Sequence, residues 1–579
     1  MKKIICLASC ACLSLFFMGC EDMLNLYPKD SLSPSTYFSN ENELKIYTNY
    51  FYNQMPGAAD SYNESADDFI RTSLGDEMLG QRSPSWESGW TWGMLRRINY
   101  YLQHSHNCKE ISARNHYDGM AYFMRAYFYL NKVRRYGDVP WYDQVLGSAD
   151  EELLYKPRDD RKMVMKHVMA DLDSAIVKLP TKHSLYEVTK WTALALKSRA
   201  GLFEGTFRKY HGLGDSEFFL SEAAVAGNQF ITESGYSLYS TGSQPYRDLF
   251  ACDEAKGEEV IMARCYTGTM AYLHSVQYQA NISSDKCCFT RRFANHYLMA
   301  DGTRFTDKAG NDTMQYIRET KDRDPRMSQT LLCPGYTQKG ESKVSANILF
   351  THTGYQFIKY VMETSYDAYN KSPNDWPLFR TAEVYLNFAE AKAELGTLTQ
   401  NDIDISVNKI KDRAKMPHLS LLEANGNPDA YLQGCYPNVS KSTNTGVILE
   451  IRRERTIELC LEGHRYWDIM RWKEGKQFEN KFYGLYFPGE GNYDMTGDGK
   501  VDLILYTTTY KKVLGATARK IGTDIILSNG TSGYMCGLPS IKISWKENRD
   551  YLYPIPLDEI VLTGRILTQN PGWEVESNN

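Results

Sequence analysis

The sequence of 579 residues has no run of lysine and arginine, and its formal net charge is −5. Proteins that bind nucleic acid hold the phosphates with clustered basic side chains. We therefore expect no nucleic-acid partner. The motifs G-x-S-x-G, H-E-x-x-H, Walker A and G-x-G-x-x-G are also absent. Adjacent acids at Asp67-Asp68 and Asp159-Asp160 do not establish a pair across a glycosidic bond, so no catalytic site is indicated.

Cysteine pairs at metal-binding spacing are missing as well. Of the 13 cysteines, four lie in the first 20 residues, and none of the other nine forms a C-x-x-C pair. The spacing therefore favours neither a zinc site nor a thiol-redox site. An odd number of cysteines cannot all pair, and we interpret most of them as small buried apolar residues.

Aromatic residues, in contrast, are abundant. They make up 13% of the chain, which has 42 Tyr and 10 Trp. Aromatic rings stack on the apolar faces of sugars and on nucleic-acid bases. Since the charge argues against nucleic acid, this composition favours a sugar ligand.

The N-terminus has the features of a targeting segment. Lys2 and Lys3 precede an apolar run from Ile4 to Met18, which is shorter than the ~20 residues that a membrane-spanning helix needs. We interpret residues 1–19 as a signal peptide. The run ends at Gly19-Cys20, which resembles a bacterial lipobox.

This resemblance implies that the thiol of Cys20 receives diacylglycerol and that residues 20–40 form a lipidated N-terminus and tether. Several acyl chains anchor a protein stably to a membrane. Glu21-Asp22 resembles the acidic signal that directs such lipoproteins to the outer face of the outer membrane.

Three segments place small and aromatic residues at helical spacing and predict helices. They are Asp118 to Tyr136, Trp191 to His211, and Phe379 to Leu395. The first two begin 73 residues apart, close to two tetratricopeptide repeats of about 34 residues each. Residues 236–375 lose this periodicity, although Val260 to Cys265 reads as a short strand. Long loops on a rigid scaffold commonly carry binding residues.

The stretch from Ile448 to Gly475 predicts one long helix or a helix pair. Its charges do not fall on a separate solvent face. Glu462, Arg465, Asp468 and Arg471 alternate in sign at helical spacing. Charges on a packed stripe need partners, so we interpret them as an internal ion-pair clamp rather than as catalytic groups.

The string RRERTIELCLEGHRYWDIMRW, from Arg452 to Trp472, resembles the signature of the SusD/RagB family. Members of this family are surface lipoproteins that work with TonB-dependent transporters to capture nutrients, mostly glycans. MRAYFYLNKVRRYGDVP, FRTAEVYLNFAEAKAELG, YPIP and QNPGW resemble other family motifs. The resemblance implies a mainly α fold, with a tetratricopeptide-like helical-hairpin scaffold, long irregular loops and a few short strands. We expect a helical part at 41–235 and a loop-rich part at 236–579, packed as one body.

The resemblance also implies a function. We expect an outer-membrane lipoprotein that faces the cell surface, binds a glycan and passes it to a SusC-like TonB-dependent transporter, with no organic cofactor and no catalysis. Two alternatives stay open, which are a peptide-capturing scaffold like RagB and a surface glycoside hydrolase.

A glycan site needs aromatic faces with polar groups nearby in an irregular segment. The string SPSWESGWTW concentrates Trp86, Trp90 and Trp92. Trp90 and Trp92 precede a helix and can belong to the core, so Trp86 is the best candidate for an exposed ring. The other candidates are two residues near this string and four aromatic residues of the long loops. These are Tyr62, Arg82, Tyr266, Tyr336, Tyr355 and Trp376.

One motif indicates a metal. The stretch from Asp494 to Asp502 resembles the first part of an EF-hand loop, with Gly499 at the required glycine position. The implied ligands are Asp494, Thr496, Asp498, the Lys500 carbonyl and Asp502. Position 12 is Leu505 instead of glutamate, so the alternative is a glycine-rich hairpin. We expect a calcium ion with a structural role.

Overall fold

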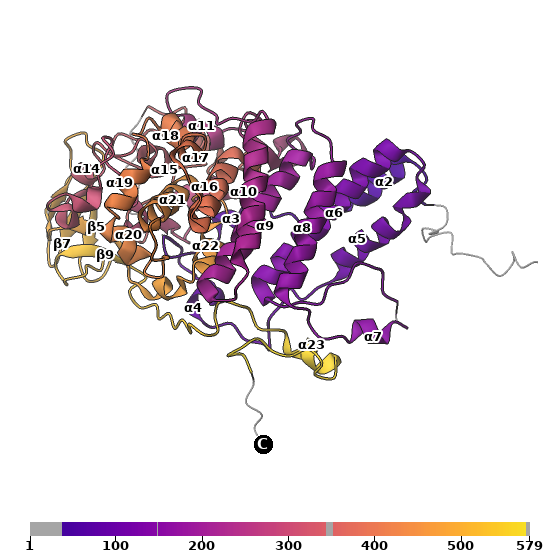
Figure 1. Cartoon of the computed structure of the whole chain (residues 1–579). Helices are drawn as coiled ribbons and strands as arrows, with labels where there is room; N and C mark the ends of the chain where they lie inside the picture. The colour runs from indigo at the N-terminus through magenta and orange to yellow at the C-terminus, as the bar shows by residue number, and fades with distance from the viewer. Residues whose placement is uncertain (1–36, 148, 343–350, 575–579) are drawn as a thin grey trace, which may run out of the picture.

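The structure, a computed structural model, describes residues 37–147, 149–342 and 351–574. Long helices stand side by side across one half of the molecule (Figure 1). They are α5 (Gly93–His104), α6 (Ile111–Tyr136), α8 (Arg161–Lys178), α9 (Lys190–His211), α10 (Ser216–Glu233) and α16 (Thr381–Leu395). From α6 to α16, each of these helices packs on the next one in the series. The mainly α, tetratricopeptide-like prediction is confirmed.

Small residues allow these helices to approach closely. A Cβ atom on Gly201 of α9 would lie 2.7 Å from the carbonyl oxygen of Phe219 in α10, and one on Gly205 would lie 2.7 Å from the side chain of Leu220. Larger residues at these positions would force the two helices apart.

Two predicted helix boundaries need correction. The first predicted helix is part of α6, which already begins at Ile111. The third was predicted from Phe379, but Phe379 and Arg380 belong to strand β4 (Trp376–Arg380), which pairs antiparallel with β2 (Val260–Arg264). Pairing with a distant strand holds these residues extended, so tertiary contacts override the helical pattern there.

The signature stretch is a helix pair. α21 (Thr445–Glu458) and α22 (Arg465–Arg471) are separated by a turn in which Leu461 and Gly463 have φ values of 60° and 76°. Glycine adopts this left-handed conformation without steric cost. Charged residues of both helices, such as Glu458 and Asp468, are buried.

The loop-rich half carries short strands. β1 (Phe69–Ile70) pairs with β3 (Cys288–Phe289), and β5 (Phe482–Phe487) pairs with β9 (Gly533–Gly537). β7 (Leu503–Tyr506) lies between β6 (Gly491–Tyr493) and β8 (Thr517–Lys520), antiparallel to the first and parallel to the second.

The C-terminal segment returns to the N-terminal helices. The amide of Tyr553 donates to the carbonyl of Arg135 at 2.6 Å, and the Asn570 side chain donates to the carbonyl of Tyr136 at 2.9 Å. The short helices α23 (Leu557–Leu562) and α7 (Glu151–Leu154) lie at the lower edge of Figure 1. The two ends of the chain therefore share one core cluster, which runs from Phe38 to Leu567.

Six of the nine cysteines that follow Cys20 are buried, and all nine are free thiols, as predicted for most of them. None of the helices in the described ranges is long and apolar enough to cross a bilayer.

Candidate ligand-binding site

Trp86 is the one sequence-predicted tryptophan that is strongly exposed, with 68% of its surface accessible. The loop that carries it is fixed at both sides. The Leu557 amide donates to the carbonyl of Pro84 at 3.0 Å, and Arg135 donates to Glu87 at 2.6 Å. Trp86 is therefore an aromatic ring presented to solvent by a braced loop, as its sequence context predicts.

Most of the other predicted residues have little accessible surface. These are Tyr62, Arg82, Trp90, Tyr266, Tyr336, Tyr355 and Trp376, all buried, while Trp92 is half-buried. Arg82 stacks on the rings of Tyr553 and Trp573. The Tyr355 hydroxyl donates to Glu319 at 2.6 Å. Arg82 and Tyr355 thus use their side chains for interior contacts and offer no open surface to a ligand.

Three of the predicted residues do converge. Tyr62, Tyr266 and Trp376 surround His274, with ring centroids 6.1, 4.6 and 5.7 Å from the imidazole. The Nε2 atom of His274 is 2.9 Å from the carbonyl of Asn374, and burial lowers the pKa of this histidine to about 4. The imidazole is therefore uncharged at neutral pH, and the cluster forms a packed layer beneath the surface loops.

An open hollow of about 1090 Å³ adjoins this cluster at Tyr266. Tyr186 and Tyr366 line the hollow from two other loops. Tyr186 is 41% exposed, so part of its ring faces solvent. Tyr272, which is 44% exposed, stacks on Tyr266 with centroids 4.9 Å apart and planes 5° from parallel.

Asp375 connects three segments by hydrogen bonds at one side of the hollow. Its carboxylate accepts hydrogen bonds from the Tyr186 hydroxyl at 2.7 Å and from the amides of Tyr266 and Ala255 at 3.0 and 3.2 Å. Further charged groups of both signs line the space, and Lys339 pairs with Glu363 at 3.0 Å. The hollow thus combines aromatic rings with many hydrogen-bonding groups.

A second open hollow has the same volume, about 1090 Å³, and lies between the loop at 298–308 and the segment at 417–427. It is lined by charged and small residues and has no Phe, Tyr or Trp among them. Sugar recognition needs aromatic faces as well as polar groups, so this difference favours the hollow beside Tyr266.

Tyr186, Tyr272 and Tyr366 did not emerge from the sequence reasoning. Tyr186 lies in the polar connection between α8 and α9, and Tyr272 and Tyr366 lie in the same loop-rich region as the predicted Tyr266. The position of Tyr186 in a short connection between two helices was the only feature of the sequence that could have indicated it. Whether its ring is exposed depends on how the loops pack, which the sequence does not show.

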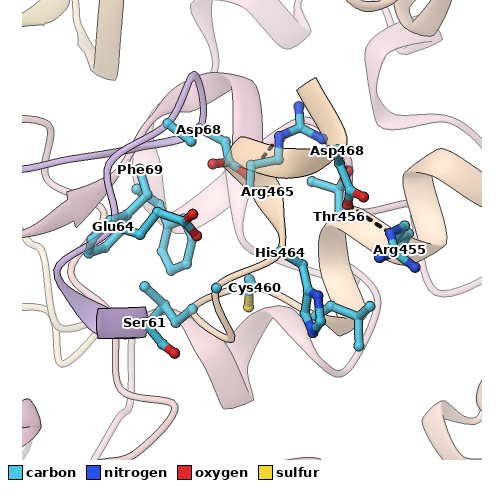
Figure 2. Close-up of a pocket in the computed structure, with 15 residues that line it drawn as sticks. Ser61, Glu64, Asp68, Phe69, Arg455, Thr456, Cys460, His464, Arg465 and Asp468 are labelled. Atoms are coloured by element: carbon cyan, nitrogen blue, oxygen red, sulfur yellow. Dashed lines mark hydrogen bonds and ion pairs between the residues drawn. The ribbon is translucent and has the colours of Figure 1, made fainter. Parts of the chain in front are cut away.

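A small cavity in the interior has the residue types of a catalytic site. Glu64, Asp68, His464 and Asp468 surround one space (Figure 2). Burial and the nearby Asp468 raise the pKa of Glu64 to about 8, and burial raises the pKa of Asp68 to about 7. The cavity has a volume of only about 20 Å³, enough for a single water molecule. A sugar ring does not fit there.

Two residues of the predicted internal clamp, Arg465 and Asp468, line this cavity. Glu462 accepts from Arg380 at 2.6 and 2.8 Å, and Arg465 donates to Asp67 at 2.7 and 2.8 Å. Asp468 accepts from Arg471 at 2.9 Å. Burial acts to raise the pKa of Asp67, but the guanidinium groups of Arg465 and Arg292 hold it at about 2. The clamp interpretation is therefore confirmed, with partners on distant segments.

The predicted calcium loop brings its carboxylates together. Ligand oxygens of Asp494, Asp498 and Asp502 lie within 4.8 Å of one another. Asp502 also accepts from the hydroxyl of Thr496 at 3.0 Å, and the ammonium of Lys500 pairs with Asp498 at 2.8 Å. The oxygen-rich set suits calcium, although the lysine competes for one carboxylate. Leu505 lies in β7 and supplies no ligand.

Comparisons with known proteins place these features in context. Residues 258–573 match the SusD family. SusD-like protein P38 of Formosa agariphila is 23% identical over 522 residues, which cover 81% of this chain and 91% of the relative. A SusD-like protein of Bacteroides fragilis is 20% identical, with a TM-score of 0.64 over 93% of this chain and 98% of its own. A SusD-like carbohydrate binding protein of the same species is 19% identical, with a TM-score of 0.65 over 92% and 99%.

Proposed function

Because the chain belongs to the SusD family, we propose that it binds a glycan at the cell surface and delivers it to a SusC-like TonB-dependent transporter. The observation that carries this proposal is the open hollow in which Tyr186, Tyr266 and Tyr366 meet a dense set of polar groups. A structural neighbour is described as a carbohydrate binding protein, which supports the same ligand class.

The hollow suits a glycan in both shape and chemistry. A sugar ring has apolar C–H faces that stack on exposed aromatic rings, while its hydroxyls need donors and acceptors. The exposed part of the Tyr186 ring offers such a face, and carboxylates, ammonium groups and hydroxyls line the walls. With about 1090 Å³, the space accommodates several sugar units, since ligand pockets range from about 300 to 1,000 Å³.

Trp86 is the second candidate position, favoured by its exposure and by its braced loop. It does not line the hollow. A ligand held there would therefore not reach the tyrosine rings that line the hollow.

Two other functions compete with glycan capture. The mixed charges of the hollow would also hold the ends and side chains of a peptide. A hydrolase would need two suitably placed carboxyl groups, but Asp375 already accepts three hydrogen bonds and Glu363 is paired with a lysine. Glu64 and Asp68, whose pKa values are raised to about 8 and about 7, lie around a cavity too small for a sugar.

A binding panel separates these functions. Purified protein is titrated with oligosaccharides of different composition and with peptides of similar length, and each mixture is analysed for cleavage products. Saturable glycan binding without products is expected. Peptide binding alone would favour the RagB-like alternative, and released sugars would favour the hydrolase.

We propose in addition that Cys20 anchors the protein to the outer membrane through lipid. Cys20 lies outside the described residues, whose first helix, α2 (Glu41–Asn49), begins just after the expected tether. A surface lipoprotein with a tether of this length can stay attached while it is docked on a transporter.

We also propose that calcium binds at Asp494, Thr496, Asp498, the Lys500 carbonyl and Asp502. The amide of Gly335 donates to the carbonyl of Thr496 at 2.9 Å, so the loop braces a neighbouring segment. An ion there would fasten this insertion and would have no catalytic role.

A further inference from the structure

A separate cavity of about 310 Å³ lies between the N-terminal helices and the C-terminal helix α23. It shares no lining residue with the hollow beside Tyr266. Its inner wall includes Trp90, Trp92, Leu95, Pro140, Tyr142 and Leu146, and its outer side includes Leu154 of α7, Glu559 of α23, and Thr563 and Leu567. The cavity is therefore mostly apolar, with a few polar groups.

Two hydrogen-bond donors at this cavity lack acceptors. Among the described residues, no acceptor lies opposite the indole N–H of Trp90 or of Trp92, although Trp90 is only 6% exposed. Most other buried tryptophans have an acceptor, and Trp141 is an exception. Trp472, for example, donates to Glu390 at 2.7 Å, and Trp573 donates to the carbonyl of Leu552 at 3.0 Å. A buried indole N–H usually has a partner, so the donor of Trp90, together with that of the half-buried Trp92, is available to an acceptor on a ligand.

The outer side of the cavity is weakly held. Neither α7 nor α23 contains a buried residue. Leu154 is 38% exposed and Leu562 is 70% exposed, and Ile560 of α23 is only partly buried against the core. Segments with so few buried contacts open at low free-energy cost, which gives a small molecule a way in.

We propose that this cavity binds a small aromatic group that carries a hydrogen-bond acceptor. Aromatic rings pack favourably against tryptophan and tyrosine in edge-to-face and offset arrangements. Engineered apolar cavities of about half this volume already bind benzene. An unsubstituted sugar fits less well, because most of the lining is apolar and its hydroxyls would meet few polar side chains beyond those of Arg96, Asn99, Gln144, Glu559 and Thr563. The acceptor of the ligand would take a hydrogen bond from a free indole N–H.

The proposal does not depend on glycan capture and can be tested with simple probes. Benzamide supplies an aromatic ring and a carbonyl acceptor, and cyclohexanecarboxamide supplies the same acceptor on a saturated ring. Binding of each to the full chain is measured by calorimetric titration. We expect saturable binding of benzamide at one site, and binding of the saturated analogue at least fivefold weaker.

Two neighbouring leucines provide a matched pair of variants. Leu154 lines the cavity, whereas Leu153 does not, and the two are similarly exposed at 38% and 36%. Leu154→Trp should fill the cavity and weaken benzamide binding at least tenfold, while Leu153→Trp should leave it unchanged. Absence of saturable binding to the wild type, or equal binding by both variants, would overturn the proposal. Equal affinity for benzamide and cyclohexanecarboxamide would overturn the claim that the ligand is aromatic. The Leu154→Trp variant should bind glycan with the affinity of the wild type. The proposal of glycan capture and the proposal for this cavity can therefore be refuted independently.

Discussion

The hydroxyl of Tyr186 donates a 2.7 Å hydrogen bond to the carboxylate of Asp375, which lies 189 residues later in the chain. Asp375 is buried and also accepts two backbone amides. The ring of Tyr186 is therefore held in one orientation at the wall of the hollow while 41% of its surface stays exposed. A preorganised ring loses little conformational entropy when a ligand stacks on it.

Removal of Glu458 should strongly destabilise the fold. Its buried carboxylate accepts from the guanidinium groups of Arg380 at 2.7 Å, Arg326 at 3.2 Å and Arg413. Glu458→Gln leaves three buried cations without their shared anion, which costs about 3–5 kcal/mol. Urea unfolding measures the loss. The control Glu479→Gln breaks an exposed pair with Lys476 and should cost less than about 1 kcal/mol. Equal effects of the two substitutions would contradict the clamp.

The interior carboxyl of Glu64 predicts a pH dependence of stability. Its pKa is raised from 4.5 to about 8 in the folded state, first by burial and then by Asp468. Between about pH 5 and pH 8 the folded state holds a proton that the unfolded chain releases, so this group makes stability fall as pH rises. Its favourable contribution is complete below the unfolded pKa and is lost as pH rises through the folded pKa.

Glu64→Gln removes this titration. The melting temperature of the variant relative to the wild type should therefore increase from pH 5 to pH 8. Glu217→Gln, at an exposed position of α10, should show no such trend. A constant difference between Glu64→Gln and wild type across this pH range would rule out the raised pKa.

Chelation tests the proposed calcium. EGTA should lower the melting temperature of the wild type, because an ion bound only to the folded state stabilises it by mass action. Asp498→Ala removes one of the three converging carboxylates and should abolish the response. If both proteins respond equally, or neither does, the loop is a glycine-rich turn without a metal.

Cell fractionation tests the lipid anchor. Cys20→Ala should release the protein from the membrane fraction, since no acyl chain can be attached. Cys12→Ala, inside the expected signal peptide, is the matched control and should remain membrane-bound. Retention of Cys20→Ala in the membrane fraction would exclude anchoring through this residue.

Three helices of the scaffold could be predicted from their local periodic pattern, and the resemblance to family motifs implied the scaffold that they form. The charges between Glu462 and Arg471 likewise pointed to an internal clamp. The partners of that clamp, such as Arg380 and Asp67, could not be named. They come from distant segments, and only the folded chain brings them together.

The ligand-binding residues were less predictable. Tyr266 and Trp376 belong to the same irregular region as Tyr366, but the first two are buried beneath the hollow, whereas Tyr366 is half-buried in its wall. Residue type and loop context do not fix exposure, because loops cover one another in the folded state. The exposure of Trp86 was predicted correctly, whereas its role in binding stays a prediction.

The most direct test of glycan capture is a titration of the ligand found by the panel against wild type, Tyr186→Ala and Trp86→Ala. Loss of a stacking contact costs roughly 1–3 kcal/mol. Tyr186→Ala should weaken binding by this amount, Tyr186→Phe should retain most of the affinity, and Trp86→Ala should bind as the wild type does. Unchanged affinity in a folded Tyr186→Ala variant, or the absence of any glycan that binds, would contradict the proposed site.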